Sequence, residues 1–472
     1  MKARLLLTAF LLATLPAQAA IKAGFAERDI TPGIGAERPG GYGKVFHQIY
    51  HDPCKVRAAV FDDGKKKVAL VGLDTLMISR AVVLDARAQI EKATGIPGDC
   101  VLIGASHSHS SGPIGMVQPG QYDKAGDLVK QLAYEDSSCA DAGFLQHVTH
   151  QIVEAVTLAS RSAVPARIGF GSGKEDSVSF NRRLRMKNGL SYSHPRPGNP
   201  DMLEYAGPID PEVGVIGAWD ANGVLLGSIV NFACHATASP PGISANWICF
   251  MEEVIQGAMG SKSPVVFLQG ACGDITQVDN LNKFRQKTGE ESSRLVGGRI
   301  GAEVVKVLLG METAEDAVLD QRQNVFTIPR RKPSAERLAH SRELVAAGKP
   351  KGDTTDWTFA KEILMLEHLI EVEPNVEVEV QTIQVGPTVF VTNPAEYFVQ
   401  LGLDIKAASP FPFTYPVELA NGCVGYVPTE EAFGPHGGGY ETRLSSYSNL
   451  VINAGTLLRD AGIDLVKTMT PG

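Results

Sequence analysis

Short apolar runs, separated by segments with helical spacing, constrain the fold of this chain more than any other feature. The runs span residues 68–73, 101–104, 229–234, 265–268 and 389–391. Apolar runs of this length are typical of strands that are buried on both faces of a sheet. Between them, residues 79–94 and 144–160 have the apolar spacing of helices. This alternation predicts an α/β fold, with a mixed β-sheet core surrounded by helices.

Polar residues follow each of these runs, where the predicted strand ends. Asp74 follows the first run. A histidine pair that begins at His107 follows the second run, and His235 follows the third run. The loop 269–274 follows the fourth run, and Glu396 comes shortly after the fifth. Ligand sites of open α/β sheets lie beyond the carboxyl ends of the strands. We therefore expect these side chains to converge on one site at that edge.

The pair His107 and His109 is the clearest local sign of a metal site. Residues two apart on an extended segment face the same side, and imidazole is a ligand for zinc, copper, iron and nickel. Without other support, two hydrogen-bonded histidines explain the pair equally well. Taken singly, His235, Glu396 and Tyr426 also have ordinary explanations: a core histidine, an acid in the first turn of a helix and a core tyrosine.

The first residues have the pattern of a secretory signal peptide. Two basic residues precede an apolar run over 5–15, and Ala17 and Ala19 flank a glutamine. This pattern predicts a signal peptide over 1–19 and a periplasmic or secreted protein. The run is too short to cross a bilayer, which needs about 20 residues, and no later segment predicts a transmembrane helix. A net charge of −8 without a basic stripe disfavours a nucleic-acid partner.

The seven cysteines predict neither a structural zinc site nor a redox motif, because no two of them form a CxxC pair. An exported location would permit disulfides. The odd number requires at least one free thiol, so we expect buried thiols with at most a few bridges.

Two segments depart from the strand–helix alternation. Residues 315–371 are charged and have helical apolar spacing, which predicts a helical insertion over the core. We therefore expect residues 20–472 to form a single domain. Residues 420–447 are rich in glycine, tyrosine and serine, which predicts a long loop. Loops of this kind often carry functional residues.

Several motifs together resemble those of the neutral ceramidase family, the non-lysosomal, zinc-dependent amidases that cleave ceramide. The resemblance extends from residue 24 to about Tyr447. It rests on the segments GFAERDITP at 24–32, ASHSHSSGP at 105–113, NR at 181–182, NFACHAT at 231–237, QGACGDIT at 269–276, NPAE at 393–396 and NGCVGY at 421–426.

This resemblance implies a ligand set for Zn²⁺, which consists of His107, His235, Glu396 and Tyr426. It also implies that His109 handles a proton and that Arg182 contacts the carbonyl region of the substrate. Two imidazoles, a carboxylate and a phenol are ligands that suit zinc. The ring N–H groups of the ligating histidines should each find a carbonyl or carboxylate partner. Asp74 is a candidate for that role, with a strand-end cap as the alternative.

The chain departs from the family pattern at three places. Thr276 and the two residues after it stand where the family has Ser-Pro-Asn. Threonine keeps the hydroxyl but stiffens the side chain, so we expect water activated by the metal, assisted by Thr276, instead of a covalent route. The residues after Tyr447 are too few to form the C-terminal β-sandwich domain of larger family members. We therefore expect this chain to correspond to the N-terminal catalytic domain only. The chain also lacks a long apolar loop of the kind that would predict docking to a membrane.

The sequence therefore predicts a zinc-dependent hydrolase that cleaves an N-acyl amide bond, in ceramide or a related N-acyl lipid, with a place in sphingolipid metabolism. The departures leave two alternatives open. One is a zinc hydrolase of the same fold that acts on an ester, lactone or glycosidic bond of another exported substrate. The other is a non-catalytic binding protein. The sequence does not specify the physiological substrate or the oligomeric state.

Overall fold

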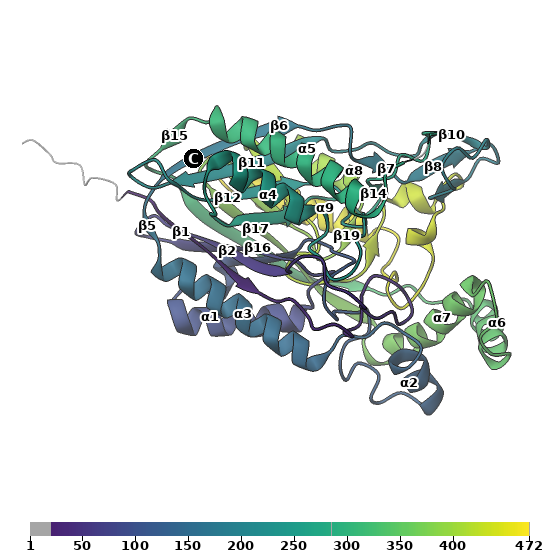
Figure 1. Ribbon diagram of the computed structural model, residues 1–472. Coiled ribbons are helices and arrows are strands. Elements are labelled where there is room, and N and C mark those ends of the chain that lie inside the picture. Colours follow the sequence, from purple (N-terminus) through teal and green to yellow (C-terminus); the bar gives the residue numbers. More distant parts are fainter. Residues whose placement is uncertain (1–19, 285, 472) are drawn as a thin grey trace, which may run out of the picture.

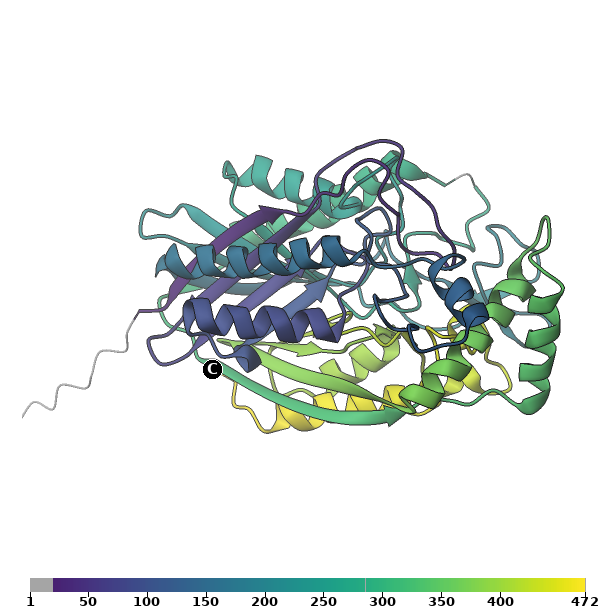
Figure 2. The same ribbon diagram turned by 90° about the horizontal axis from the view of Figure 1, so that it is seen from below.

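The computed structural model describes residues 20–284 and 286–471, so the predicted signal peptide over 1–19 lies outside the described residues. Its first sheet has the strand order β4-β3-β2-β1-β5. These strands are β1 (Lys22–Asp29), β2 (Lys55–Asp62), β3 (Lys67–Leu73), β4 (Val101–Ala105) and β5 (Val164–Pro165). Helices α1 (Arg80–Thr94) and α3 (Ala142–Arg161) cover its outer face (Figures 1 and 2).

A second sheet packs against the inner face of the first, with the order β13-β12-β11-β6-β15. Its strands are β6 (Arg167–Lys174), β11 (Glu212–Trp219), β12 (Leu225–Phe232), β13 (Val265–Gln269) and β15 (Thr313–Ala314). Helices α4 (Trp247–Met259) and α5 (Gly289–Leu309) cover it from outside. The sheets approach so closely that a Cβ atom at Gly72 in β3 would clash with the carbonyl oxygen of Phe267 in β13.

A third sheet continues the core, with the order β16-β17-β18-β20. It contains β16 (Leu319–Pro329), β17 (Asn375–Val385), β18 (Thr388–Thr392) and β20 (Phe413–Val417), and α9 (Ala454–Lys467) packs on it beside α8 (Val399–Ala408). Three strand pairs are parallel, namely β3 with β4, β12 with β13, and β18 with β20, and the other pairs in these sheets are antiparallel. The predicted α/β fold with a mixed-sheet core is therefore confirmed.

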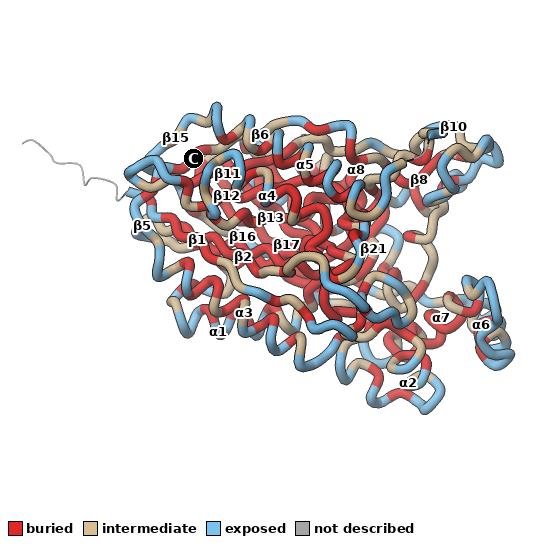
Figure 3. Tube along the Cα trace, viewed as in Figure 1, coloured by how far each residue is buried: buried red, intermediate tan, exposed pale blue. Residues whose placement is uncertain are grey.

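Smaller elements complete the fold, and most of them follow or flank the larger strands. They are α2 (Asp127–Tyr134), β7 (Phe180–Asn181), β8 (Arg183–Met186), β9 (Ser191–Ser193), β10 (Met202–Tyr205), β14 (Ile275–Thr276), β19 (Glu396–Tyr397), β21 (Tyr426–Val427), and short 3-10 helices at Gly98–Cys100, Glu430–Phe433 and Tyr440–Thr442. Buried residues run through the central strands, whereas β10 and α6 are largely exposed (Figure 3).

The region 315–371 differs in part from the predicted helical insertion. It contains α6 (Ala335–Ala346) and almost all of α7 (Thr355–Val372), but it begins with the long strand β16. That strand lies at the edge of its sheet and most of its side chains are at least partly exposed, so it has no apolar run to mark it. The assignment of 20–472 to one catalytic domain remains a prediction.

All seven cysteines are free thiols in the structure. Within residues 20–284 and 286–471, no helix is long and apolar enough to cross a membrane.

Candidate active site

The predicted site residues come together from strand ends that are far apart in the sequence. His107 follows β4, His235 follows β12, and Glu396 begins β19 after β18. The parallel pairing of β19 with β21 places Glu396 directly opposite Tyr426. All four residues therefore lie at one edge of the core, as expected from the carboxyl ends of the parallel strands.

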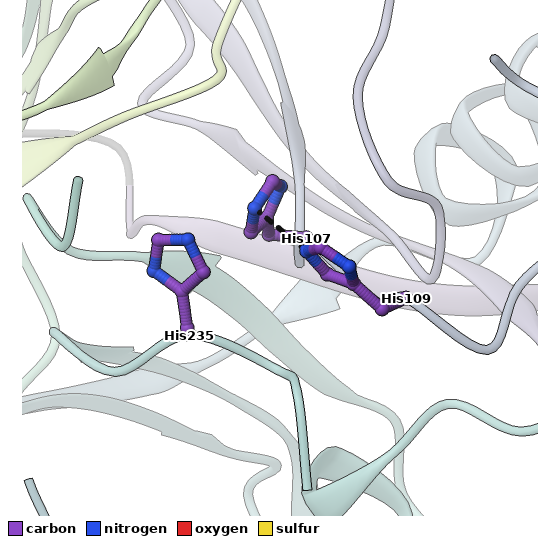
Figure 4. A group of neighbouring side chains, drawn as sticks. All are labelled: His107, His109 and His235. Carbon is purple, nitrogen blue, oxygen red and sulfur yellow. Dashed lines mark hydrogen bonds between the residues drawn. The ribbon is translucent and has the colours of Figure 1, made fainter. Parts of the chain in front are cut away.

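Three imidazoles and one carboxylate form the centre of this site. Nε2 of His107 lies 3.1 Å from Nε2 of His109. Oε2 of Glu396 lies 3.3 Å from Nε2 of His107 and 3.2 Å from Nε2 of His235. Each of the three histidines has a ring nitrogen within 4.8 Å of the others, and the rings face one common space (Figure 4). Such a cluster of nitrogen and oxygen donors is able to hold a metal ion.

Backbone carbonyls orient two of these rings. Nδ1 of His107 donates to the carbonyl oxygen of Leu76 at 2.8 Å, and Nδ1 of His235 donates to that of Cys272 at 2.8 Å. With the proton on Nδ1, the lone pair of Nε2 points into the cluster, which is the arrangement of a metal ligand. The suggestion that Asp74 fills this role is wrong. Its carboxylate pairs with Arg57 at 2.7 Å and accepts the backbone N–H of Lys55 at 2.8 Å.

Two unusual backbone features hold the histidine pair in place. His107 has a φ of 63°, in the left-handed region that residues other than glycine rarely adopt. Gly40 has a φ of 103°, and a Cβ atom there would collide with the ring of His109. Strained backbone of this kind is concentrated at functional sites. The loop around Gly40 therefore forms part of the wall behind His109.

The charges of the cluster favour metal binding. Although burial opposes the ionised form of Glu396, His107 and His235 keep the pKa of its carboxyl well below the usual range. Burial, together with the charges of its neighbours, lowers the pKa of His109 well below that of a free histidine. Burial and the charge of Arg182 lower the pKa of His235 to about 3. An ionised carboxylate and neutral imidazoles are the forms that bind metal. His107 differs from the other two histidines, because despite burial Glu396 raises the pKa of its ring, so a metal would displace a proton there.

Arg182 lies beside the cluster and is almost fully buried. Its Nε donates to Glu441 at 2.8 Å and its Nη2 donates to the carbonyl oxygen of Gly273 at 2.6 Å. Its Nη1 lies 2.9 Å from Nε2 of His235, so a metal bound at that nitrogen would require this end of the guanidinium to withdraw. The structure thus places Arg182 where it is able to contact a group bound next to the metal.

A cavity of about 360 Å³ opens over the cluster. Thr276 lines it together with Arg182, Tyr426 and the site histidines His109 and His235. Further lining residues were not predicted from the sequence, and they include Tyr42, His194, Gln277, Tyr440 and Tyr447. Tyr447 also donates to Oε1 of Glu396 at 2.8 Å. The only sequence signal for Tyr440 and Tyr447 is their position in or at the end of the segment 420–447, which was predicted to be a functional loop.

Comparisons with known proteins agree with this arrangement. No family model matches the chain. A neutral ceramidase of Pseudomonas aeruginosa is 29% identical over 244 residues, which cover 50% of this chain and 33% of that relative. A solved structure of a ceramidase complexed with C2 superposes with a TM-score of 0.68 at 19% identity, over 96% of this chain and 77% of that one. This chain resembles the neutral ceramidases in sequence and shares their fold.

A crystal structure of the neutral ceramidase from Pseudomonas aeruginosa gives the same result, with a TM-score of 0.68 and 20% identity over 95% of this chain and 74% of that one. The resemblance inferred from the sequence motifs is therefore confirmed. Because the matched sequence spans only a third of the curated relative, we treat the activity of that protein as a proposal for this chain.

Proposed function

We propose that this protein is an exported, zinc-dependent hydrolase that cleaves an N-acyl amide bond, in ceramide or a related N-acyl lipid. The observation that carries this proposal is the buried cluster of His107, His109, His235 and Glu396 at the floor of a cavity. Its occurrence on the fold of the neutral ceramidases supports an amide as the bond that is cleaved. The signal-peptide pattern over 1–19 supports export.

The donor set fits zinc. We assign the ion to His107, His235, Glu396 and Tyr426, which offer two imidazole nitrogens, a carboxylate and a phenol. Bound zinc would lower the pKa of a water molecule toward 7 and polarise the substrate carbonyl. His109 also points a nitrogen at this space, so the structure alone allows it to be a ligand. We assign it a catalytic role because its pKa is held low and because, unlike His107, it lines the cavity.

The remaining assignments concern the substrate. Arg182 and the hydroxyl of Thr276 both line the cavity, where they are able to donate hydrogen bonds to the carbonyl oxygen as negative charge develops on it. Neutral His109 would accept a proton and pass it to the leaving nitrogen, a role that histidine often fills. We assign no covalent role to Thr276, because its hydroxyl lies against Gln277 at 3.3 Å, and an amide is not a base that would activate it.

Several polar side chains in the lining of the cavity favour one second candidate, a zinc hydrolase that cleaves an ester, lactone or glycosidic bond. Besides the tyrosines, Thr237, His194 and Gln277 line the cavity, whereas an N-acyl lipid with long chains would be expected to contact more apolar side chains. Tyrosine and amide groups of this kind equally suit a hydroxylated substrate.

Metal analysis combined with a substrate panel tests the proposal. The purified protein is expected to contain one zinc per chain and to release fatty acid from N-acyl sphingosines of short and long chain length. Chelation should abolish the release, and added zinc should restore it. His340→Ala, at an exposed histidine far from the cluster in sequence, is a matched control that should keep both metal and activity. Zinc-dependent cleavage of esters or glycosides without amide cleavage would select the second candidate, and a metal-free active enzyme would refute both.

A further inference from the structure

A second cavity lies behind the active site. It has a volume of about 440 Å³, within the range of small-molecule sites. Its walls come from strand β8, helices α8 and α9 and the 3-10 helix Glu430–Phe433. The residues that line it differ from those that line the active-site cavity. Arg182 and Arg183 are consecutive in an extended segment, so their side chains point to opposite sides, one toward each cavity.

Arg183 is the unusual residue of this second cavity. Its side chain is only 2% exposed, and its Nη2 has no hydrogen-bond partner among the described residues. Its Nε donates to the carbonyl oxygen of Gly438 at 3.2 Å, and its Cζ lies 5.3 Å from the centroid of the Phe398 ring. A buried guanidinium without a paired carboxylate carries a large desolvation cost.

The acids around the cavity are already occupied by other partners. Asp274 accepts the backbone N–H of Val399 at 2.9 Å and the amide of Asn181 at 2.8 Å. Asp404 lies 3.4 Å from Arg459, and Glu431 lies 2.7 Å from Arg185. Glu430 accepts a hydrogen bond from the hydroxyl of Thr456 at 2.6 Å. Of the three arginines that line this cavity, Arg183 is therefore the one without a carboxylate partner among the described residues.

We propose that this cavity binds a small oxyanion, a carboxylate or a phosphate, through Arg183. The planar guanidinium presents parallel N–H groups that match two oxygens of such a group. Arg185 and Arg459 also line the cavity, and each is paired there with an acid, which leaves Arg183 as the cation available to an anion. Because Arg182 directly precedes Arg183 and lines the active-site cavity, an anion held by Arg183 would stabilise the wall of the active site from behind.

Thermal unfolding of the zinc-loaded protein tests the proposal with sodium phosphate, sodium acetate and, for comparison, sodium chloride at matched ionic strength. A ligand that binds only the folded state raises Tm. We expect phosphate or acetate to raise Tm by about 1–3 °C more than chloride does. The salt that gives the larger rise shows which of the two anion types the cavity prefers. The readout is folding stability, so the result does not depend on the proposed hydrolase activity.

Three variants show whether the effect arises at Arg183. Arg183→Met should lose most of the anion-specific rise, and Arg459→Gln, at a partly exposed position on the same wall, should reduce it. Arg299→Gln removes a surface arginine that pairs with Glu175 away from the cavity, and it should keep the full rise. The proposal is overturned if neither anion exceeds chloride in the unmodified protein, or if both Arg183→Met and Arg459→Gln retain the full rise.

Discussion

Glu418 is a buried acid behind the metal cluster, and replacing it with glutamine should change how stability depends on pH. Its side chain is 1% exposed, and burial raises the pKa of its carboxyl from 4.5 to about 8. Its Oε2 accepts the backbone N–H groups of Cys272 and Tyr397 at 2.8 and 2.9 Å, and its Oε1 accepts from the Cys272 thiol at 2.9 Å. The carbonyl oxygen of Cys272 in turn orients His235.

The raised pKa fixes the sign of the effect. Between pH 4.5 and about 8 the folded chain keeps a proton on Glu418 that the unfolded chain has released. The free energy of unfolding therefore falls as pH rises through this window, by about 1.4 kcal/mol per pH unit for this group. At pH 7 the loss is about 3 kcal/mol relative to a residue that does not titrate. Glutamine has nearly the same shape and still offers one oxygen to the two N–H groups.

Urea unfolding at pH 5, 6, 7 and 8, in buffer with a chelator, measures this difference. Relative to the unmodified protein, Glu418→Gln should gain stability steadily as pH rises and level off near pH 8. Glu343→Gln, which replaces an exposed glutamate, is the control and should follow the unmodified protein at every pH. Parallel curves for Glu418→Gln and the unmodified protein would refute the reasoning, because they would mean that Glu418 has the same pKa in the folded and unfolded chain.

Substitutions at four positions in the site give further expected outcomes. His107→Ala should remove most of the zinc measured by elemental analysis, because its Nε2 faces the centre of the cluster. His109→Ala should keep zinc but lose about 10²–10⁴-fold in kcat, and a parallel loss of zinc would make this histidine a ligand. Thr276→Ser should stay active, whereas Thr276→Ala should lose about 10²–10³-fold in kcat with its zinc intact, and an acyl adduct on Thr276 in mass spectrometry would contradict the water route. Tyr447→Phe removes the hydrogen bond to Glu396 and should weaken zinc affinity or activity by about 10–100-fold, which a zinc titration of the two proteins checks.

The strand ends were predictable because their signals are local. A buried strand is marked by an apolar run, and the polar residue directly after it is marked by contrast with that run. His107 and His235 were found in this way, and the parallel pairing of β3 with β4 and of β12 with β13 explains why their strands end at one edge. Glu396 follows the same rule after β18. The local pattern placed these three residues at strand ends, whereas their assignment as zinc ligands came from the resemblance to the neutral ceramidases.

Contacts between distant segments could not be predicted from local patterns. Glu396 meets Tyr426 because two very short strands, β19 and β21, pair in parallel, and strands of two residues carry no periodicity. Tyr447 reaches Glu396 from a loop that has no repeating pattern at all. Asp74 shows the opposite error, since it has the right position after a strand but is paired with Arg57 of the neighbouring strand β2.

Helix α7 shows why charge in a sequence does not reveal burial. The region that contains it was predicted to be an insertion over the core because it is rich in charged residues. Two of those residues, Lys361 and Glu362, are nevertheless only 1% and 2% exposed. Lys361 donates to the carbonyl oxygen of Tyr42 at 2.8 Å, and Glu362 accepts a hydrogen bond from Ser446.

Tyr42 and the residue after Ser446 both line the active-site cavity. The buried pair Lys361 and Glu362 therefore holds two walls of that cavity by hydrogen bonds. One wall contains Tyr42, near the start of the chain, and the other contains Tyr447, near its end. A buried ion pair costs desolvation free energy unless its hydrogen bonds are complete, and Lys361 meets this condition with further bonds to the carbonyl oxygen of Asp136 and the hydroxyl of Ser137. The helix that looked like a peripheral insertion is thus a structural part of the site, because it fixes the distance between the loops that enclose the cavity.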